Sequence, residues 1–306
     1  MRKHRAHIKK CIVNCRMNIL VTGADGFVGK RLVQKLMLEG HNVISNRSAD
    51  GDITHVRFDD IDVDWIVHLA ARTFVPQSWK EPYDYYRVNV LGTANVLECC
   101  RRTGAGITFL SSYIYGLPET TPVLESHRFN PNSPYNHSKV LAESLIQFYG
   151  REFGINSVTL RPFNIYGAGQ DSHFLVPFII NQVLDSSVKE IVVQNLSPKR
   201  DYLFVEDLIE AVTLSLSRQG NSIYNIGSGV SYSVEEILQL TMQVSGIHKP
   251  YRETGERRQG ELYDLIADVS LVKQDIGWEP RVNLFNGISK MIKELKQTNA
   301  AKHSSG

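Results

Sequence analysis

The sequence predicts an α/β protein in which a doubly wound parallel sheet is joined to a smaller C-terminal α/β domain. Apolar strand-like runs alternate with amphipathic helical segments through the first half of the chain, an order typical of parallel sheets with helices on both faces. A glycine-rich turn joins the first of these strands to the first helix. The run "DWIVHLAA" (64–71) is almost unbroken in its apolar character, as expected for a strand that is buried on both faces.

The composition excludes two classes of partner. Hydrophobic residues make up 42% of the chain and charged residues 22%, which is ordinary for a globular enzyme. The formal net charge of +2 gives no reason to expect a nucleic acid. No apolar run approaches the roughly 20 residues of a membrane helix. We therefore expect a cytoplasmic protein that binds neither nucleic acid nor membrane.

Both ends of the chain are expected to be disordered. Residues 1–16 are basic and lack the apolar core of a secretory signal, so we expect a disordered arm with the folded chain beginning near Met17. Residues 297–306 are expected to form a disordered tail. The four cysteines have no zinc-ligand company, so we expect reduced thiols and no metal site; they are Cys11, Cys15, Cys99 and Cys100.

A strand, a glycine turn and a helix open the predicted sheet. The apolar run 18–22 is followed by glycines spaced G-x-x-G-x-x-G, then by apolar residues at helical spacing, and "HNVIS" (41–45) reads as the second strand. Glycines at such a turn let the backbone approach a pyrophosphate, which the helix N-terminus then holds. The pattern predicts a Rossmann-like domain whose cofactor contacts include Gly23, Gly26, Phe27, Val28 and Gly29.

The residue after the second strand bears on which dinucleotide is bound. NAD-binding units usually place Asp or Glu there, to bond the ribose hydroxyls, whereas this chain has Arg47. A guanidinium can fork onto a 2′-phosphate, so NADP(H) is favoured. NAD(H) is the alternative, with Asp50 or Asp52 as the ribose ligand. We expect "GDI" (51–53) to form a short strand along the adenine, which assigns Asp52 and Ile53 to the cofactor.

Two further strands and a helix are expected between residues 64 and 112, and the first of these strands is expected to contact the cofactor. The strand 64–71 ends in small residues that leave room where a cofactor crosses the sheet, and this assigns Leu69, Ala70 and Ala71 to it. A long helix is expected over 85–103, ending at Gly104, and "GITFLSS" (106–112) reads as the following strand.

Tyr135 and Lys139 lie at the start of an amphipathic helix expected over 134–153. Residues four apart share one face of a helix. A lysine ammonium beside a phenol favours the phenolate, and a phenol with a lowered pKa can take a proton from a sugar hydroxyl or return one to a carbonyl. Y-x-x-x-K alone is a weak signal; a dinucleotide fold and a serine at the end of strand 106–112 make it a stronger one.

Seven elements together resemble the extended short-chain dehydrogenase/reductase family of nucleotide-sugar epimerases, dehydratases and reductases. In chain order they are "TGADGFVG", "HLAA", "NVLGTANVLE", "LSSYIYG", "PYNHSK", "RPFNIYG" and "RDYLFVEDLIEA". The resemblance runs from about Met17 to Lys296.

The resemblance implies a Rossmann domain over 17–164, with its sheet completed by segments near 200–227. A substrate-binding α/β domain would comprise 165–199 and 228–296. It also implies a catalytic triad of Ser111, Tyr135 and Lys139, with Lys139 holding the nicotinamide ribose. Ser111 is chosen because the family's serine or threonine stands five residues before the glycine of "YG"; Ser112 is the alternative.

The remaining residue roles also come from the resemblance. Asn89 is assigned to the cofactor. A nucleotide-diphosphate sugar would be held by Ser112, Asn164, Arg200, Arg258 and Glu261, with the two arginines on the diphosphate and Glu261 on the nucleoside ribose. The helices over 85–103 and 134–153 would form a homodimer through a four-helix bundle.

The reaction is left between alternatives. Family 4,6-dehydratases have an Asp-Glu pair after their threonine, and this chain has Ser112-Tyr113, which disfavours that reaction. Arg47 and the short 51–55 region favour an NADP(H)-dependent NDP-4-keto-6-deoxy-hexose reductase. The alternative is an NDP-hexose 4-epimerase of the UDP-glucose type with tightly bound NAD, and a third is a non-catalytic dinucleotide sensor.

Overall fold

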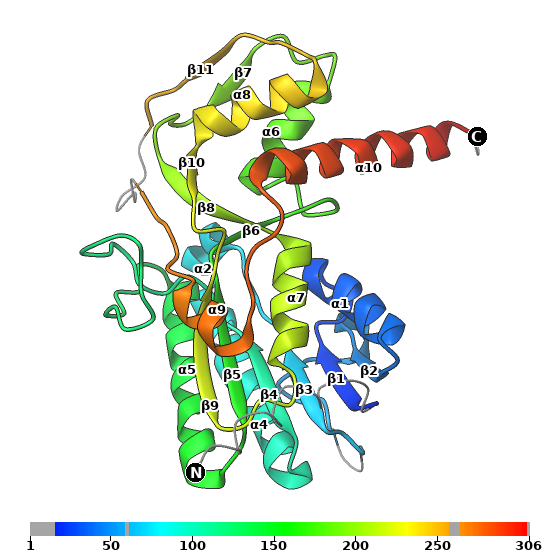
Figure 1. The fold of residues 1–306 in the computed structure, drawn as a ribbon, viewed down its shortest axis with the longest axis vertical. Helices are drawn as coiled ribbons and strands as arrows, with labels where there is room; N and C mark the ends of the chain where they lie inside the picture. Colours follow the sequence, from blue (N-terminus) through cyan, green and yellow to red (C-terminus); the bar gives the residue numbers. More distant parts are fainter. Residues whose placement is uncertain (1–15, 59–60, 257–263, 305–306) are drawn as a thin grey trace, which may run out of the picture.

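A computed structural model describes residues 16–58, 61–256 and 264–304 of the chain (Figure 1). Within these residues the central sheet has six strands, all parallel, in the order β2-β1-β3-β4-β5-β9. Their bounds are β1 Asn18–Thr22, β2 Asn42–Asn46, β3 Trp65–His68, β4 Gly106–Leu110, β5 Ser157–Pro162 and β9 Asn221–Ile226. The expected doubly wound parallel sheet is confirmed.

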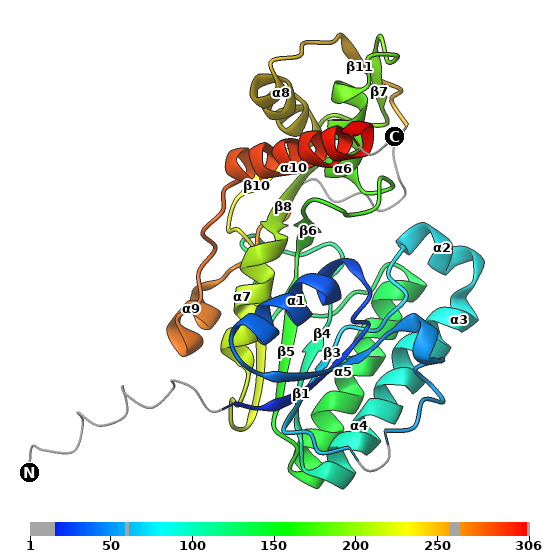
Figure 2. The same cartoon turned by 90° about the vertical axis from the view of Figure 1, so that its right-hand side faces the viewer.

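Helices cover both faces of this sheet (Figure 2). On one face α1 (Phe27–Leu38) and α7 (Val205–Ser215) pack against each other and against the sheet. On the other lie α4 (Gly92–Thr103) and α5 (Pro134–Phe153). Alternate residues of β1 divide between the two cores, as strand geometry requires: Ile19 and Val21 join the first and Leu20 the second.

The second unit lies beyond the carboxyl ends of the strands, at the top of Figure 1. It holds two small sheets, ordered β10-β8-β6 and β11-β7 in the described part of the chain. The strands are β6 Asn164–Tyr166, β7 Ile191–Val193, β8 Lys199–Phe204, β10 Ser231–Ser233 and β11 Tyr251–Glu253. Helices α6 (Leu175–Leu184), α8 (Val234–Ser245) and α10 (Leu284–Ser304) share a core with them.

Helix α5 begins and ends where the sequence predicts. Ser133 caps its first turn, because the Ser133 Oγ accepts a hydrogen bond of 3.1 Å from the Asn136 N–H. Pro134 occupies the first helical position, where no N–H is needed. Gly154 follows the last turn in the left-handed conformation with φ of 69°, which glycine adopts without strain. The cap fixes the position of Tyr135 in the first turn.

Four expectations differ from the structure. No strand forms at 51–53; the chain runs from the short helix η1 (Ser48–Asp50) into a turn, and Ile53 is buried in the sheet–helix core. The helix expected over 85–103 is three consecutive segments, α3 (Pro82–Tyr86), the π-helical η2 (Arg87–Leu91) and α4.

The other two differences concern the later part of the chain. Near 200–227 only β9 completes the central sheet, because β8 pairs with β6 and β10 in the second unit. At the C-terminus, residues 297–304 continue α10 instead of forming a disordered tail. Of the arm expected at 1–16, residues 1–15 lie outside the described residues, as do Cys11 and Cys15. Cys99 and Cys100 are buried and form no disulfide within the described residues. No helix in the described residues combines the length and apolarity needed to cross a membrane.

Candidate active site

A cleft of about 570 Å³ opens at the carboxyl ends of the parallel strands, the edge at which open α/β sheets bind ligands. One wall is the glycine turn between β1 and α1, with Gly23, Gly26, Phe27, Val28 and Gly29. The floor comes from the ends of β3, β4 and β5, and the second unit closes the other side with residues that include Asn164, Arg200 and Tyr202. A further stretch of the lining is Tyr135, Asn136 and Lys139 of α5.

The glycine turn is shaped for the close approach of a pyrophosphate. A Cβ on Gly29 would lie 2.1 Å from the Gly23 carbonyl oxygen, and a Cβ on Gly23 would lie 2.8 Å from the Ala70 nitrogen. Gly23 also has a φ of 68°. Gly26 is exposed towards the cleft, immediately before the first turn of α1. The turn therefore fits a dinucleotide, whose charge the N–H groups of α1 would meet.

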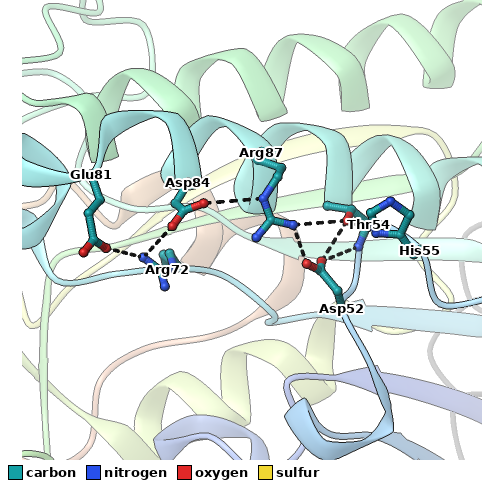
Figure 3. Close-up of polar contacts among 7 residues, drawn as sticks. All are labelled: Asp52, Thr54, His55, Arg72, Glu81, Asp84 and Arg87. Carbon is teal, nitrogen blue, oxygen red and sulfur yellow. Dashed lines mark hydrogen bonds and ion pairs between the residues drawn. The ribbon is translucent and has the colours of Figure 1, made fainter.

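Two of the predicted adenine contacts have other partners. The Asp52 carboxylate forms an ion pair with Arg87 and accepts hydrogen bonds from the N–H and Oγ1 of Thr54, at 3.0 and 2.8 Å (Figure 3). The Arg87 guanidinium holds the pKa of Asp52 well below its ordinary value. Ile53 packs against Gly92: a Cβ added to Gly92 would lie 2.7 Å from the Ile53 Cγ2. Neither Asp52 nor Ile53 is among the described residues that line the cleft.

Figure 3 shows that the Asp52–Arg87 pair continues into a row of alternating charges. Arg87 also contacts Asp84, at 3.5 Å, and the Arg72 guanidinium lies 3.5 Å from Asp84 and 2.8 Å from Glu81. The row connects the turn after η1 with α3 and with the loop after β3. Its members are partly exposed, so each pair contributes little to stability by itself. Of the segments that the row joins, the loop after β3 lines the cleft, with Leu69, Ala71 and Thr73.

Asn89 braces the loop after β3. It exchanges two hydrogen bonds with the Arg72 backbone, at 2.8 and 3.0 Å, and donates a third to the Ser138 Oγ at 2.8 Å. Asn89 is 1% exposed, and it sits in the π-helical turn η2. The family resemblance assigns Asn89 to the cofactor; among the described residues that line the cleft, Ala71 appears and Asn89 does not.

Tyr135 and Lys139 occupy the predicted face of α5, but their electrostatics differ from the expectation. Lys139 is 3% exposed; its ammonium donates to the Leu110 carbonyl at 2.8 Å and lies 4.7 Å from the centroid of the Phe109 ring. Burial lowers the pKa of Lys139 to about 7, with the nearby Glu143 acting in the opposite direction. Burial likewise raises the pKa of Tyr135 to about 12, opposed by the Ser112 hydroxyl. Burial dominates the pKa of both groups, so the pKa of Tyr135 is raised and not lowered as expected from the neighbouring Lys139.

Ser111 and Ser112 point in different directions, as consecutive residues leaving a strand do. The Ser111 Oγ donates a hydrogen bond of 2.5 Å to the Glu143 Oε1, inside the protein. The Ser112 Oγ is buried and has no hydrogen-bond partner among the described residues. It lies near enough to the Tyr135 hydroxyl to lower the pKa of that phenol. Of the two serines, Ser112 is the one that offers its hydroxyl beside Tyr135.

Sequence reasoning missed Glu143, which anchors Ser111. Glu143 lies one helical turn after Lys139, and its carboxylate is gripped by Arg161 of β5 at 2.6 Å, with both side chains 1% exposed. Arg161 also donates to the Tyr115 hydroxyl at 2.7 Å. The sequence does contain a signal for this pair: Glu143 lies four residues after Lys139, and Arg161 is the arginine of "RPFN".

The side of the cleft formed by the second unit includes two of the residues that the resemblance assigns to the substrate. Asn164 and Arg200 both line it, and the Asn164 Nδ2 donates to the Asp201 carbonyl at 3.2 Å. The buried Asp201 carboxylate accepts from the N–H groups of Ser228, Gly229 and Ala267, at 2.6, 3.0 and 3.1 Å, and so ties β8 to the loop after β9 and to the segment around Ala267. Arg258 and Glu261 lie outside the described residues.

A second unpartnered atom was not foreseen from the sequence. Gln170, in the loop after β6, lines the cleft, and its Nε2 donates to the Ile165 carbonyl at 2.9 Å. Its Oε1 is buried without a hydrogen-bond partner in the described residues. The amide oxygen of Gln170 is therefore an unpaired acceptor within a residue of the cleft wall.

No group of three or more His, Cys, Asp or Glu side chains suited to a metal ion occurs within residues 16–58, 61–256 and 264–304.

Comparisons with known proteins agree on the family. A sequence model described as the NAD dependent epimerase/dehydratase family matches residues 19–227. A UDP-glucose 4-epimerase of Lactobacillus helveticus is 30% identical, with 87% of this chain and 92% of that protein covered. The UDP-glucose 4-epimerase of Thermotoga maritima, solved with UDP-glucose, has a TM-score of 0.85 and 27% identity, covering 92% of this chain and all of its own.

Another solved structure is similar in fold. RMD from Pseudomonas aeruginosa, complexed with NADPH, has a TM-score of 0.84 at 24% identity and covers 92% of this chain and 99% of its own. At this identity the likeness concerns the fold alone.

Proposed function

The chain belongs to the NAD dependent epimerase/dehydratase family, within the extended short-chain dehydrogenases/reductases. We propose that it is an NDP-hexose 4-epimerase that acts on a UDP-sugar. The observation that carries the proposal is the meeting of Tyr135, Lys139 and Ser112 in the cleft that the glycine turn also borders. The epimerase activity of the Lactobacillus and Thermotoga relatives favours this reaction over the 4-ketoreductase that the sequence alone favours.

A nicotinamide dinucleotide, when bound, supplies the acceptor and donor of hydride at sugar C4. The glycine turn would hold its pyrophosphate, and Leu69 and Ala71 would flank its path over the strand ends. Lys139, beside the Leu110 carbonyl at the end of β4, would hold the ribose next to the nicotinamide.

Tyr135 would exchange a proton with the sugar O4. Burial raises the pKa of Tyr135 to about 12, so a positive charge beside the phenol, as on an oxidised nicotinamide ring, would be needed to form the phenolate that takes the O4 proton. The phenol so formed can return that proton to the carbonyl oxygen. Ser112 would donate a hydrogen bond to the same oxygen, which gives its unpartnered hydroxyl a ligand. Ser111 would not contact the substrate; its hydrogen bond to Glu143 would hold the end of β4 against α5.

The sugar nucleotide would lie against the second unit. Asn164 and Arg200 face the cleft there and would contact the diphosphate, since a fixed guanidinium binds phosphate oxygens well. Arg258 and Glu261 keep the roles given by the family resemblance. We also propose that the protein is a homodimer formed by the helical segments 85–103 and 134–153 through a four-helix bundle; on the second of these, Leu141 and Phe148 are exposed.

A 4-ketoreductase is the second candidate, and Arg47 at the end of β2 is the observation that favours it. The two can be separated by supplying UDP-glucose without any added cofactor. An epimerase regenerates its own cofactor at every turnover and forms UDP-galactose. A reductase forms no product until a keto sugar and NADPH or NADH are both present.

A further inference from the structure

We propose that Asp25 selects against a 2′-phosphate and so gives the cleft a preference for NAD(H) over NADP(H). This inference rests on the proposed function only in assuming that a dinucleotide binds along the glycine turn. It runs against the prediction from Arg47.

Asp25 lies in the glycine turn, directly before Gly26. Its two carboxylate oxygens each accept a hydrogen bond of 3.2 Å from the Ser48 N–H, and one also accepts from the Ser48 hydroxyl. Ser48 is the second residue after β2. The Asp25 carboxylate is thereby fixed between the turn that meets the pyrophosphate and the strand end at which a dinucleotide places its adenosine ribose.

The backbone after β2 is occupied by acceptors. The N–H of Arg47 donates to the Asp50 Oδ2 at 2.7 Å, and the next N–H, that of Ser48, donates to Asp25. Consecutive N–H groups are a common means of binding phosphate, and here both are already paired with carboxylates. The hydrogen bonds from Ser48 also hold the pKa of Asp25 below its ordinary value, so this carboxylate is ionised at neutral pH.

The two forms of the cofactor differ in what they bring to this place. A ribose 2′-hydroxyl can donate a hydrogen bond to a carboxylate, which is a strong pairing. A 2′-phosphate has no proton to give at neutral pH and adds nearly two negative charges. Two positive groups lie near Asp25 in the described residues. Arg47 is exposed and directly follows β2, and Lys30 interacts with the Asp25 charge. Arg47 would have to attract the phosphate against both Asp25 and Asp50.

The test is a comparison of cofactor affinities. NADH and NADPH are titrated into the full-length protein after any endogenous cofactor has been removed, and binding is followed by the fluorescence of the reduced nicotinamide. The variant Asp25→Asn keeps the size and the acceptor oxygen but removes the charge. Ser48→Ala is the matched control, because it removes the hydroxyl partner and leaves the charge.

We expect the unmodified protein to bind NADH more tightly than NADPH. Asp25→Asn should tighten NADPH binding on the order of tenfold, because one charge repulsion at short range is removed, and should weaken NADH binding to a smaller extent, because the 2′-hydroxyl then donates to a neutral acceptor. Ser48→Ala should leave the ratio of the two affinities unchanged. An unmodified protein that prefers NADPH, or an Asp25→Asn ratio equal to that of the unmodified protein, would overturn the inference. A protein that binds NADH tightly but epimerises no sugar would refute the proposed function and leave this selectivity intact.

Discussion

Arg161 and Glu143 form an ion pair inside the protein, with 2.6 Å between the Arg161 Nη2 and the Glu143 Oε2 and each side chain 1% exposed. The arginine comes from β5 and the glutamate from α5, so the pair ties the helix of Tyr135 to the central sheet. The Arg161 guanidinium also lies over the Phe129 ring, 4.7 Å from its centroid. The hydrogen bond from Ser111 reaches the same carboxylate. The position of α5 relative to the central sheet therefore depends on this buried ion pair.

Replacing Glu143 by Ala should lower the free energy of unfolding by about 3–5 kcal/mol, because Arg161 would be left as an unpaired buried charge. Urea unfolding of the variant measures this loss. The matched control is Glu190→Ala, which removes the carboxylate of the Arg252–Glu190 surface pair, whose side chains are 57% and 46% exposed. That loss should be below about 1 kcal/mol. Equal losses in the two variants would contradict the assignment.

The two serines should separate into a catalytic and a supporting role. Ser112→Ala should lower kcat by about 10²-fold with the fold intact, because it removes a hydroxyl beside the reacting oxygen. Ser111→Ala should leave kcat close to that of the unmodified protein and lower the free energy of unfolding by about 1–3 kcal/mol, because a hydrogen bond to a buried carboxylate is lost. Steady-state kinetics and urea unfolding of both variants decide the matter. If Ser111→Ala is the one that loses turnover, the assignment is reversed.

Two glycines of the same turn should respond differently to one added methyl group. Gly29→Ala would place its Cβ 2.1 Å from the Gly23 carbonyl oxygen, so we expect a large loss of stability or of soluble protein. A Cβ on Gly26 meets only the Gly23 oxygen, at 3.2 Å, so Gly26→Ala should fold but bind NADH more weakly. Thermal unfolding and NADH titration measure the two effects. Normal NADH affinity in Gly26→Ala would show that the pyrophosphate does not lie against this turn.

Lys139 should make the stability depend on pH. Its pKa is about 7 in the folded protein and 10.5 in its ordinary state, so the unfolded chain binds more protons between these values. Stability must then rise with pH across that window, since deprotonation relieves the cost of a buried charge. The unfolding free energy of the unmodified protein minus that of Lys139→Met should therefore become more positive from pH about 7 to pH about 9.5. A value of this difference that stays constant over the range would show that Lys139 keeps its ordinary pKa.

The sequence predicts the elements that depend on local pattern. The bounds of α5 follow from Ser133, Pro134 and Gly154, and the glycine turn follows from its spacing. Such features are set by neighbouring residues, so they can be read without knowledge of the fold. Residues brought to the cleft by strand order, such as Tyr135 and Leu69, also follow once a parallel sheet is assumed.

What the sequence misses depends on contacts between distant segments. Counting back from Gly116 selects Ser111, whereas the direction of each side chain leaving β4 places Ser112 beside Tyr135. Ile53 packs beneath Gly92, 39 residues further along the chain, and this contact replaces the expected strand. The pKa of Lys139 could not be read from its spacing to Tyr135 either, because burial, and not the neighbouring phenol, dominates it.

The most direct test of the proposed function follows the hydrogen at sugar C4. The purified protein is incubated with UDP-glucose deuterated at C4, with no cofactor added, and the products are examined by mass spectrometry and NMR. We expect UDP-galactose that keeps the deuterium at C4, because hydride leaves and returns within one active site. A Tyr135→Phe variant should form little of it while still binding NADH. Failure of the unmodified protein to form UDP-galactose, together with reduction of a 4-keto sugar by added NADPH or NADH, would contradict the epimerase assignment and support the reductase.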